Sequence, residues 1–108
     1  MINSRAKGKC GELEFSHFLQ SMGVKARRGA QFSGGPESPD VVTELPVHIE
    51  VKRVEALQLR AAIQQAKDDS GGKPWCVAHR WNRGDWVAIV DMRWLIQILA
   101  GKGDPEPP

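Results

Sequence analysis

The feature that most constrains the fold is a stretch in which apolar and polar side chains alternate. From Val47 to Arg53, valine, isoleucine and valine alternate with histidine, glutamate and lysine. Successive side chains of a β-strand point to opposite faces, so this alternation predicts a strand with one apolar and one polar face. The alternation also places Glu50 and Lys52 side by side on the polar face.

The remaining patterns predict helices and strands on both sides of this strand. Helices are expected at 8–22, 56–69 and 91–100, and strands at 24–28, 41–44, 47–53, 75–79 and 86–90. The short Leu45–Pro46 connection predicts a hairpin between the second and third strands, and Asp91 is placed to cap the last helix. The order α-β-β-β-α-β-β-α predicts the α/β class, with one mixed central β-sheet flanked by helices.

Length and composition fit a single globular domain over residues 1–100. The chain has 108 residues, of which 41% are hydrophobic and 26% charged, and we expect a glycine- and proline-rich loop at Gly29–Pro39 and a disordered tail at 101–108. No apolar run approaches the roughly 18 residues of a membrane span, and no secretory signal follows the basic N-terminus. Cys10 and Cys76 form no CxxC pair, so neither a disulfide framework nor a zinc site is expected. We therefore expect a cytoplasmic protein with no membrane partner.

The net charge of +2 hides an uneven distribution along the chain. Residues 1–39 carry a net +3, residues 40–70 a net −2, and residues 71–100 a net +2. A metal-dependent enzyme that acts on a polyanion needs an acidic pocket with positive charge around it. Charges scattered over an ordinary surface would give the same totals, so the distribution permits this function without selecting it.

Two short motifs carry the residues with chemical potential. Pro39-Asp40 stands at the start of one predicted strand, and Glu50-Val51-Lys52 stands in the next. A hairpin of this length would bring Asp40 beside Glu50. The two carboxylates would then close onto one site.

The predicted helix at 8–22 contributes a third carboxylate. At about 100° per residue, Glu12 lies on the flank of the apolar face and is directed toward the body of the protein, whereas Glu14 is directed to solvent. Three converging carboxylates repel one another unless a cation lies between them. Oxygen ligands alone favour Mg²⁺, with Mn²⁺ as a substitute, over zinc.

Lys52 has a role beside such a metal site. A lysine next to two metal-bound carboxylates can orient or help to deprotonate the attacking water, or offset charge on a phosphorane-like transition state. The alternative is that Glu50 and Lys52 belong to a solvent-facing row of the strand, because a Glu-x-Lys pair alone is a weak signal.

The aspartate and the Glu-x-Lys pair of the two strands resemble the signature of the PD-(D/E)xK nuclease superfamily. More narrowly, Lys7-Gly8-Lys9-Cys10-Gly11-Glu12, which leads into an amphipathic helix, and the later Arg27-Arg28 are similar to Holliday-junction resolvases of the archaeal type and their small phage relatives. The motifs cover the chain from about Arg5 to about Ala66, and element order alone extends the resemblance to about Leu99.

The resemblance implies a restriction-endonuclease-like fold and a metal-dependent endodeoxyribonuclease that resolves Holliday junctions in DNA recombination and repair. It assigns Glu12, Asp40 and Glu50 to the metal, and Lys52 to the water that attacks the phosphodiester. It also implies a homodimer that cuts opposite strands of a four-way junction. Gln65 matches a glutamine that many members carry on the helix after the signature, although a plain exposed glutamine fits the position as well.

Basic residues near the signature and in the second half of the chain are candidates for contacts with DNA phosphates. They are Arg5, Lys7, Lys9, Arg27, Arg28, Arg80 and Arg83. A solvated basic surface is the alternative for each of them. His48 is either close to the site or a bystander on the strand, and Trp81 is a candidate for base stacking or for an interface.

Two other functions are compatible with these residues. Another nuclease of the same superfamily, of the repair or restriction type, would carry the same signature. A non-catalytic DNA-binding protein that retains the fold would carry the basic residues without hydrolysing DNA.

Overall fold

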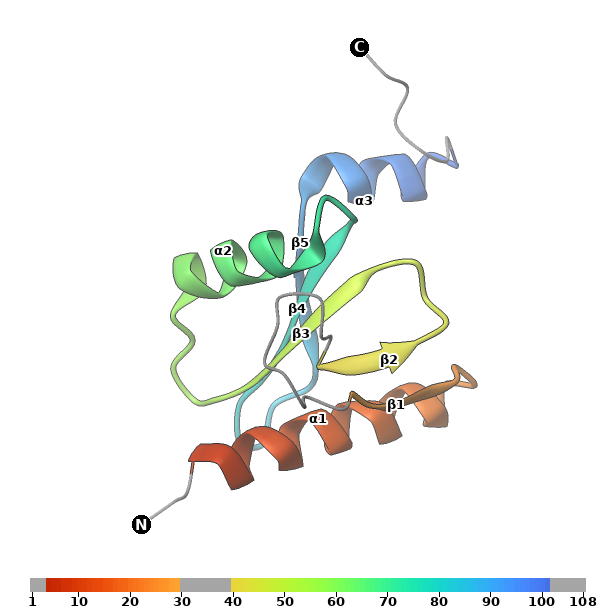
Figure 1. The fold of residues 1–108 in the computed structure, drawn as a ribbon. Helices are drawn as coiled ribbons and strands as arrows, with labels where there is room; N and C mark the ends of the chain where they lie inside the picture. Colours follow the sequence, from red (N-terminus) through yellow and green to blue (C-terminus); the bar gives the residue numbers. More distant parts are fainter. Residues whose placement is uncertain (1–3, 30–39, 102–108) are drawn as a thin grey trace.

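The computed structural model describes the backbone of residues 4–29 and 40–101 and the side chains of residues 10–29 and 40–101 (Figure 1). The elements are α1 (Ser4–Ser21), β1 (Ala26–Arg28), β2 (Val41–Thr43), β3 (His48–Arg53), α2 (Leu59–Ser70), β4 (Trp75–Arg80), β5 (Val87–Val90) and α3 (Met92–Leu99). Their order confirms the predicted α-β-β-β-α-β-β-α arrangement and the α/β class. The predicted loop at 29–39 and tail at 101–108 lie outside the described residues, except for Gly29 and Gly101.

Three strands form a mixed sheet in the order β3-β4-β5. β3 pairs in parallel with β4, with Glu50 opposite Val77, and β5 pairs antiparallel with β4. Parallel neighbours need a crossover connection, which α2 supplies here. The end of α2 therefore returns to the start of β3, where Asp69 lies close to His48.

The predicted hairpin between the strands at 41–44 and 47–53 is wrong. β2 pairs antiparallel with β1 instead, and these two strands form a separate sheet. The backbone N–H of His48 donates to the carbonyl of Pro74, which precedes β4. Pro46 has no N–H with which to extend a ladder from β2, so the chain turns here and enters the β3–β4 pair. The predicted single mixed sheet is thus divided into a mixed three-stranded sheet and a two-stranded one.

Helices cover both faces of the three-stranded sheet (Figure 1). On the side of α1, the buried core consists of Phe15, Leu19, Val41, Ile49 and Ala78. On the side of α2, it consists of Ala62, Ala66 and Val77. Val77 and Ala78 belong to different clusters because successive side chains of β4 point to opposite faces. We call these two sides of the sheet the α1 face and the α2 face.

Gly11 allows α1 to lie close to β3. A Cβ atom at this position would lie 2.6 Å from Cβ of Arg53 and 3.8 Å from Cγ1 of Val51. The first distance is shorter than van der Waals contact, so a larger side chain requires the helix to move away from the sheet.

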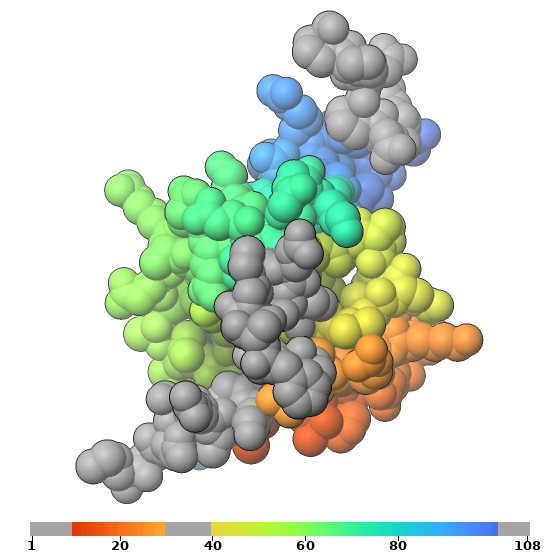
Figure 2. All heavy atoms as spheres, viewed as in Figure 1, coloured from red at the N-terminus to blue at the C-terminus, as the bar shows by residue number. Residues whose placement is uncertain are grey.

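α3 follows β5 and lies at one end of the molecule (Figure 2). Asp91 caps this helix as predicted, because its side chain accepts a hydrogen bond from the backbone N–H of Trp94 over 3.1 Å. No residue of α3 is buried, and Met92, Ile96 and Leu99 are exposed. Within the described residues, no helix is long and apolar enough to cross a membrane.

Candidate active site

Polar side chains from β3 and α2 face each other on the α2 face. His48, Glu50 and Lys52 form a row along β3, in agreement with the predicted alternation. Gln65 and Asp69, four residues apart, share a side of α2. The ammonium group of Lys52 donates to Oε1 of Gln65 over 2.8 Å, and Asp69 lies at the other end of the row, beside His48 and Glu50.

Glu50 is the centre of this arrangement. It is 1% exposed, and its Oε1 lies 2.8 Å from Nε2 of His48. Burial, followed by the neighbouring carboxylates of Asp40 and Asp69, raises the pKa of Glu50 to about 9. Burial also lowers the pKa of His48, which keeps its imidazole neutral near pH 7. Neutral imidazole and a carboxyl group that can exchange its proton for a cation are both suited to metal binding.

Asp40 reaches Glu50 by a different route from the predicted one. It directly precedes β2, and its Oδ2 accepts a hydrogen bond from the backbone N–H of Val51 over 2.8 Å. The carbonyl of Asp40 also accepts a hydrogen bond from the N–H of Gly29. A side-chain hydrogen bond, rather than a paired hairpin, therefore holds Asp40 beside β3.

In the described part of the chain, one group of three side chains offers ligand atoms that all lie within 4.8 Å of one another. It consists of His48, Glu50 and Asp69. One imidazole nitrogen and two carboxylates fit a divalent cation, with the carboxylates suited to Mg²⁺ or Mn²⁺. His48 is thus part of a potential site rather than remote from it. The trio of Glu12, Asp40 and Glu50 forms no group of this closeness among the described residues, and its role as a ligand set stays a prediction.

Sequence reasoning missed Asp69. This residue lies near the C-terminal end of α2, seventeen positions after Lys52 in the chain. The signal that points to it is the strand–helix–strand order of β3, α2 and β4, because a parallel crossover returns the end of the helix to the start of the first strand. The expected β2–β3 hairpin directed attention to Asp40 rather than to the end of α2.

The carboxylates of α1 are held by arginines on the α1 face. Nε of Arg28 donates to Oε2 of Glu12 over 2.9 Å, and Glu12 is buried, so its predicted direction is correct. The prediction that Glu14 lies in solvent is wrong. Glu14 pairs with Arg53 over 3.3 Å and also with Arg80. These contacts tie α1 to β1, β3 and β4.

The basic residues considered for DNA contacts have different environments. Arg27 and Arg83 are exposed. Arg28 and Arg80 are engaged in ion pairs with carboxylates of α1. The side chains of Arg5, Lys7 and Lys9 lie outside the described residues.

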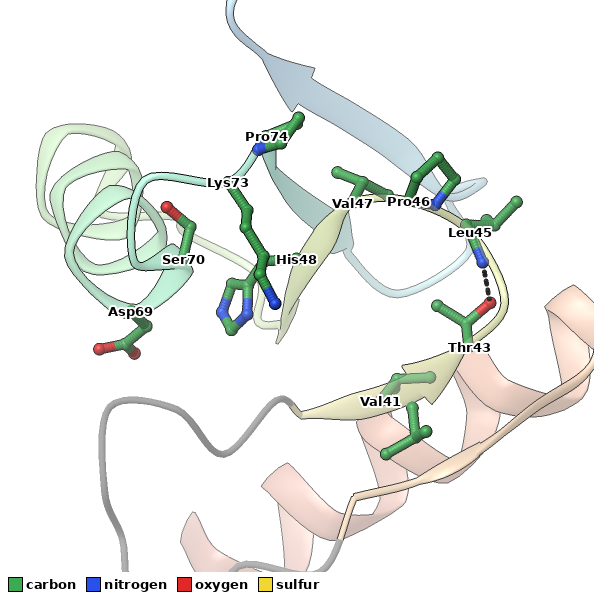
Figure 3. A pocket seen from close by; sticks show the side chains of 11 residues that line it. Val41, Thr43, Leu45, Pro46, Val47, His48, Asp69, Ser70, Lys73 and Pro74 are labelled. Atoms are coloured by element: carbon green, nitrogen blue, oxygen red, sulfur yellow. Dashed lines mark hydrogen bonds between the residues drawn. The ribbon is translucent and has the colours of Figure 1, made fainter.

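A cavity of about 700 Å³ opens beside the polar row (Figure 3). Its walls come from β2, from the connection that follows β2, and from the end of α2 with the turn after it. Figure 3 shows His48, Asp69 and Lys73 grouped on the side opposite Val41. The cavity therefore gives access to the His48 end of the row.

The comparisons with known proteins identified no relative of this chain. No family model, no curated protein and no solved structure matches the chain. The function is therefore inferred from the carboxylates, the imidazole, and the lysine and glutamine that face each other on the α2 face.

Proposed function

We propose that the protein is a Mg²⁺-dependent, structure-selective endodeoxyribonuclease that acts as a Holliday-junction resolvase. The observation that carries this proposal is the proximity of Asp40 to Glu50, with Lys52 further along the same row. Two carboxylates and a lysine in this arrangement are suited to cation-assisted hydrolysis of a phosphodiester. The resemblance of the signature to the PD-(D/E)xK superfamily supports the same function.

The donor atoms around Glu50 fit a divalent cation, because they are carboxylate oxygens and one imidazole nitrogen. When bound, such a cation offsets charge on the phosphate and lowers the pKa of a water molecule. Asp40 and Glu50 are the ligands that the signature implies, with Mn²⁺ accepted in place of Mg²⁺. The resemblance adds Glu12, but Arg28 would have to release the carboxylate of Glu12 for that role.

Lys52 acts on the reacting groups, and Gln65 positions Lys52. Gln65 accepts a hydrogen bond from the ammonium group of Lys52, which fixes the direction of the lysine side chain. The ammonium group then orients the attacking water and stabilises negative charge that develops on the phosphate oxygens. Hydrolysis leaves 5′-phosphate and 3′-hydroxyl ends, as the resemblance implies.

Exposed basic side chains hold the DNA in this proposal. Arg27 and Arg83 are exposed, and phosphate contacts from such residues position a duplex without reading its sequence. Trp81, which is 41% exposed and lies in the same connection as Arg83, offers a ring for a base or for a second copy of the chain. A single domain spans little of a four-way junction, so two copies acting in the cytoplasm would cut opposite strands during recombination or repair.

Cleavage of three DNA substrates tests this proposal. A four-way junction, a flap and a linear duplex are incubated with the purified protein at low salt in Mg²⁺ or Mn²⁺. We expect the junction to be cleaved in preference to the other two. Lys52→Ala should reduce the cleavage rate by about a hundredfold or more, whereas Lys67→Ala, which removes an exposed lysine of α2, should cleave like the wild type.

The other outcomes favour the two alternative functions. Preferential cleavage of the flap or the linear duplex would favour a repair or restriction type of nuclease from the same superfamily. A wild-type protein that binds the junction and leaves it intact in both cations would favour a non-catalytic DNA-binding protein.

A further inference from the structure

We propose that His48, Glu50 and Asp69 together bind a divalent transition-metal ion in preference to Mg²⁺, with Mn²⁺ as the probe. The proposal deepens the proposed function by adding His48 and Asp69 to Glu50 as cation ligands, a set that differs from the Asp40 and Glu50 implied by the signature. It rests on the proposed function only for the purpose of the cation. His48 and Asp69 lie outside the signature that carries the resemblance.

Two adjacent elements hold the three side chains in place. His48 and Glu50 alternate on β3, and Asp69 belongs to α2, which follows β3 in the crossover to β4. Their ligand atoms lie within 4.8 Å of one another, and Nε2 of His48 is 2.8 Å from Oε1 of Glu50. Ligands that bind at about 2.0–2.2 Å from a metal ion are roughly 3–4 Å apart. Small side-chain adjustments are therefore sufficient to form the site.

The charges around Glu50 favour a cation. Glu50 is 1% exposed and has Asp40 and Asp69 as neighbours. Among the described residues, no lysine or arginine forms an ion pair with Glu50 or Asp69, and the neutral imidazole of His48 is a hydrogen-bonding partner of Glu50. Buried neighbouring carboxylates repel one another unless a proton or a cation lies between them. A shared proton is therefore the alternative occupant of this site.

The cavity beside the polar row provides a path for the ion. His48 and Asp69 both line this cavity, and Figure 3 shows them on the same side of it. Lys73 lines the same wall and extends toward His48. An anionic group that enters the cavity would thus meet both the ion and a lysine.

The imidazole of His48 discriminates between cations. Mg²⁺ prefers oxygen ligands and retains its water, whereas first-row transition-metal ions accept an imidazole nitrogen together with carboxylates. Mn²⁺ is the appropriate probe because it accepts both kinds of ligand and is paramagnetic. A nitrogen bound directly to Mn²⁺ gives a modulation in its spin-echo signal.

Electron paramagnetic resonance of Mn²⁺ bound to the full chain, without DNA, tests the ligand set. We expect one bound Mn²⁺ per chain, a spin-echo modulation from a coordinated imidazole nitrogen, and displacement only by Mg²⁺ in about tenfold excess or more. The proposal is overturned by the absence of bound Mn²⁺, by bound Mn²⁺ without the nitrogen signal, or by displacement at equal Mg²⁺.

Substitution of single ligands gives a second measurement. His48→Gln and Asp69→Asn should each weaken Mn²⁺ binding by about tenfold or more, and the nitrogen signal should be lost in His48→Gln. The matched controls are His17→Gln and Asp68→Asn, which change exposed residues of α1 and α2 and should bind Mn²⁺ like the wild type. Ligand variants that melt like the wild type and bind Mn²⁺ as tightly contradict the proposal.

Different results would overturn the proposed ligand set and the proposed nuclease function. Nitrogen-coordinated Mn²⁺ in a protein that cleaves no DNA would support the ligand set and overturn the nuclease. Junction cleavage that is unchanged in His48→Gln and Asp69→Asn, without a nitrogen signal, would overturn the ligand set and leave the nuclease standing.

Discussion

The acidic residues on the two faces of the three-stranded sheet have different kinds of neighbours. On the α1 face, the carboxylates of Glu12 and Glu14 are paired with arginines from β1, β3 and β4. On the α2 face, Glu50 and Asp69 lie against each other and against a neutral histidine. β3 contributes to both faces, because its successive side chains alternate between them.

The difference separates residues that stabilise the fold from residues that point to a function. Opposite charges in ion pairs hold α1 on the sheet. Like charges in a buried site reduce stability, and such clusters of perturbed groups are common where a protein binds or reacts with a ligand. We therefore place function on the α2 face and structural support on the α1 face.

The largest expected effect on stability is that of Glu50→Gln on the α2 face. The folded-state pKa of Glu50, about 9, lies above its ordinary value of 4.5, so the folded protein holds the proton more tightly than the unfolded chain does. The favourable contribution of this carboxyl group is complete below pH 4.5 and is lost as the pH rises toward 9. At pH 8 without divalent cations, Glu50→Gln should be more stable by the order of a few kcal/mol.

Thermal melting between pH 4.5 and pH 9 measures this effect. The melting temperature of the wild type should fall relative to that of Glu50→Gln as the pH rises, and Mn²⁺ should stabilise the wild type alone. Glu44→Gln, which changes an exposed carboxylate, is the control and should follow the wild type. If the melting temperatures of Glu50→Gln and the wild type changed with pH in the same way, Glu50 would not reduce stability, and the proposed difference between the two faces would be wrong.

On the α1 face, Gly11→Ala should lower the free energy of unfolding by about 1–3 kcal/mol. The new methyl group would lie 2.6 Å from Cβ of Arg53, so the helix has to move. Chemical denaturation measures the loss, with His17→Ala, exposed on the same helix, as the control. Mn²⁺ affinity should not change. A variant as stable as the wild type would show that α1 is not closely packed on β3.

Glu12→Gln should have a smaller effect, a loss of about 1–2 kcal/mol in the free energy of unfolding, because Arg28 loses its charged partner. Mn²⁺ affinity should remain that of the wild type if Glu12 is structural. A clear loss of Mn²⁺ binding in Glu12→Gln, measured by titration with Mn²⁺, would instead make Glu12 the ligand that the family resemblance implies. The α1 face would then not be purely structural.

The smallest expected effect is that of Gln65→Ala. Removal of the hydrogen bond that directs Lys52 should lower kcat for junction cleavage by about tenfold with KM unchanged. Gln64→Ala, which alters an exposed glutamine paired with Asp68, should leave kcat unchanged. Equal rates for both variants would show that Gln65 does not position the lysine.

The part of the site that is local in the sequence could be predicted from it. The alternation from His48 to Lys52 fixes which side chains share a face of β3, and the order of helices and strands follows from local periodicity in the same way. Asp91 as the cap of α3 is a further local feature, and the structure confirms it.

The part that depends on strand pairing could not be predicted in the same way. Asp40 does lie beside Glu50, but a hydrogen bond to the backbone of Val51 holds it there instead of the expected hairpin. Asp69 joins the site because β3 and β4 are parallel. The strand–helix–strand order indicates that pairing, whereas the local sequence of α2 does not. The ion pairs of Glu14 likewise depend on the approach of β3 and β4 to α1.

Cleavage of a four-way junction with and without a divalent cation tests the central claim most directly. We predict that the wild type cuts opposite strands in Mg²⁺, leaves 5′-phosphate ends and makes no product in excess chelator, and that Asp40→Asn loses about a hundredfold or more in rate. Product formation in chelator, or cleavage by Asp40→Asn at the wild-type rate, would contradict the assignment of DNA hydrolysis to the carboxylates around Glu50.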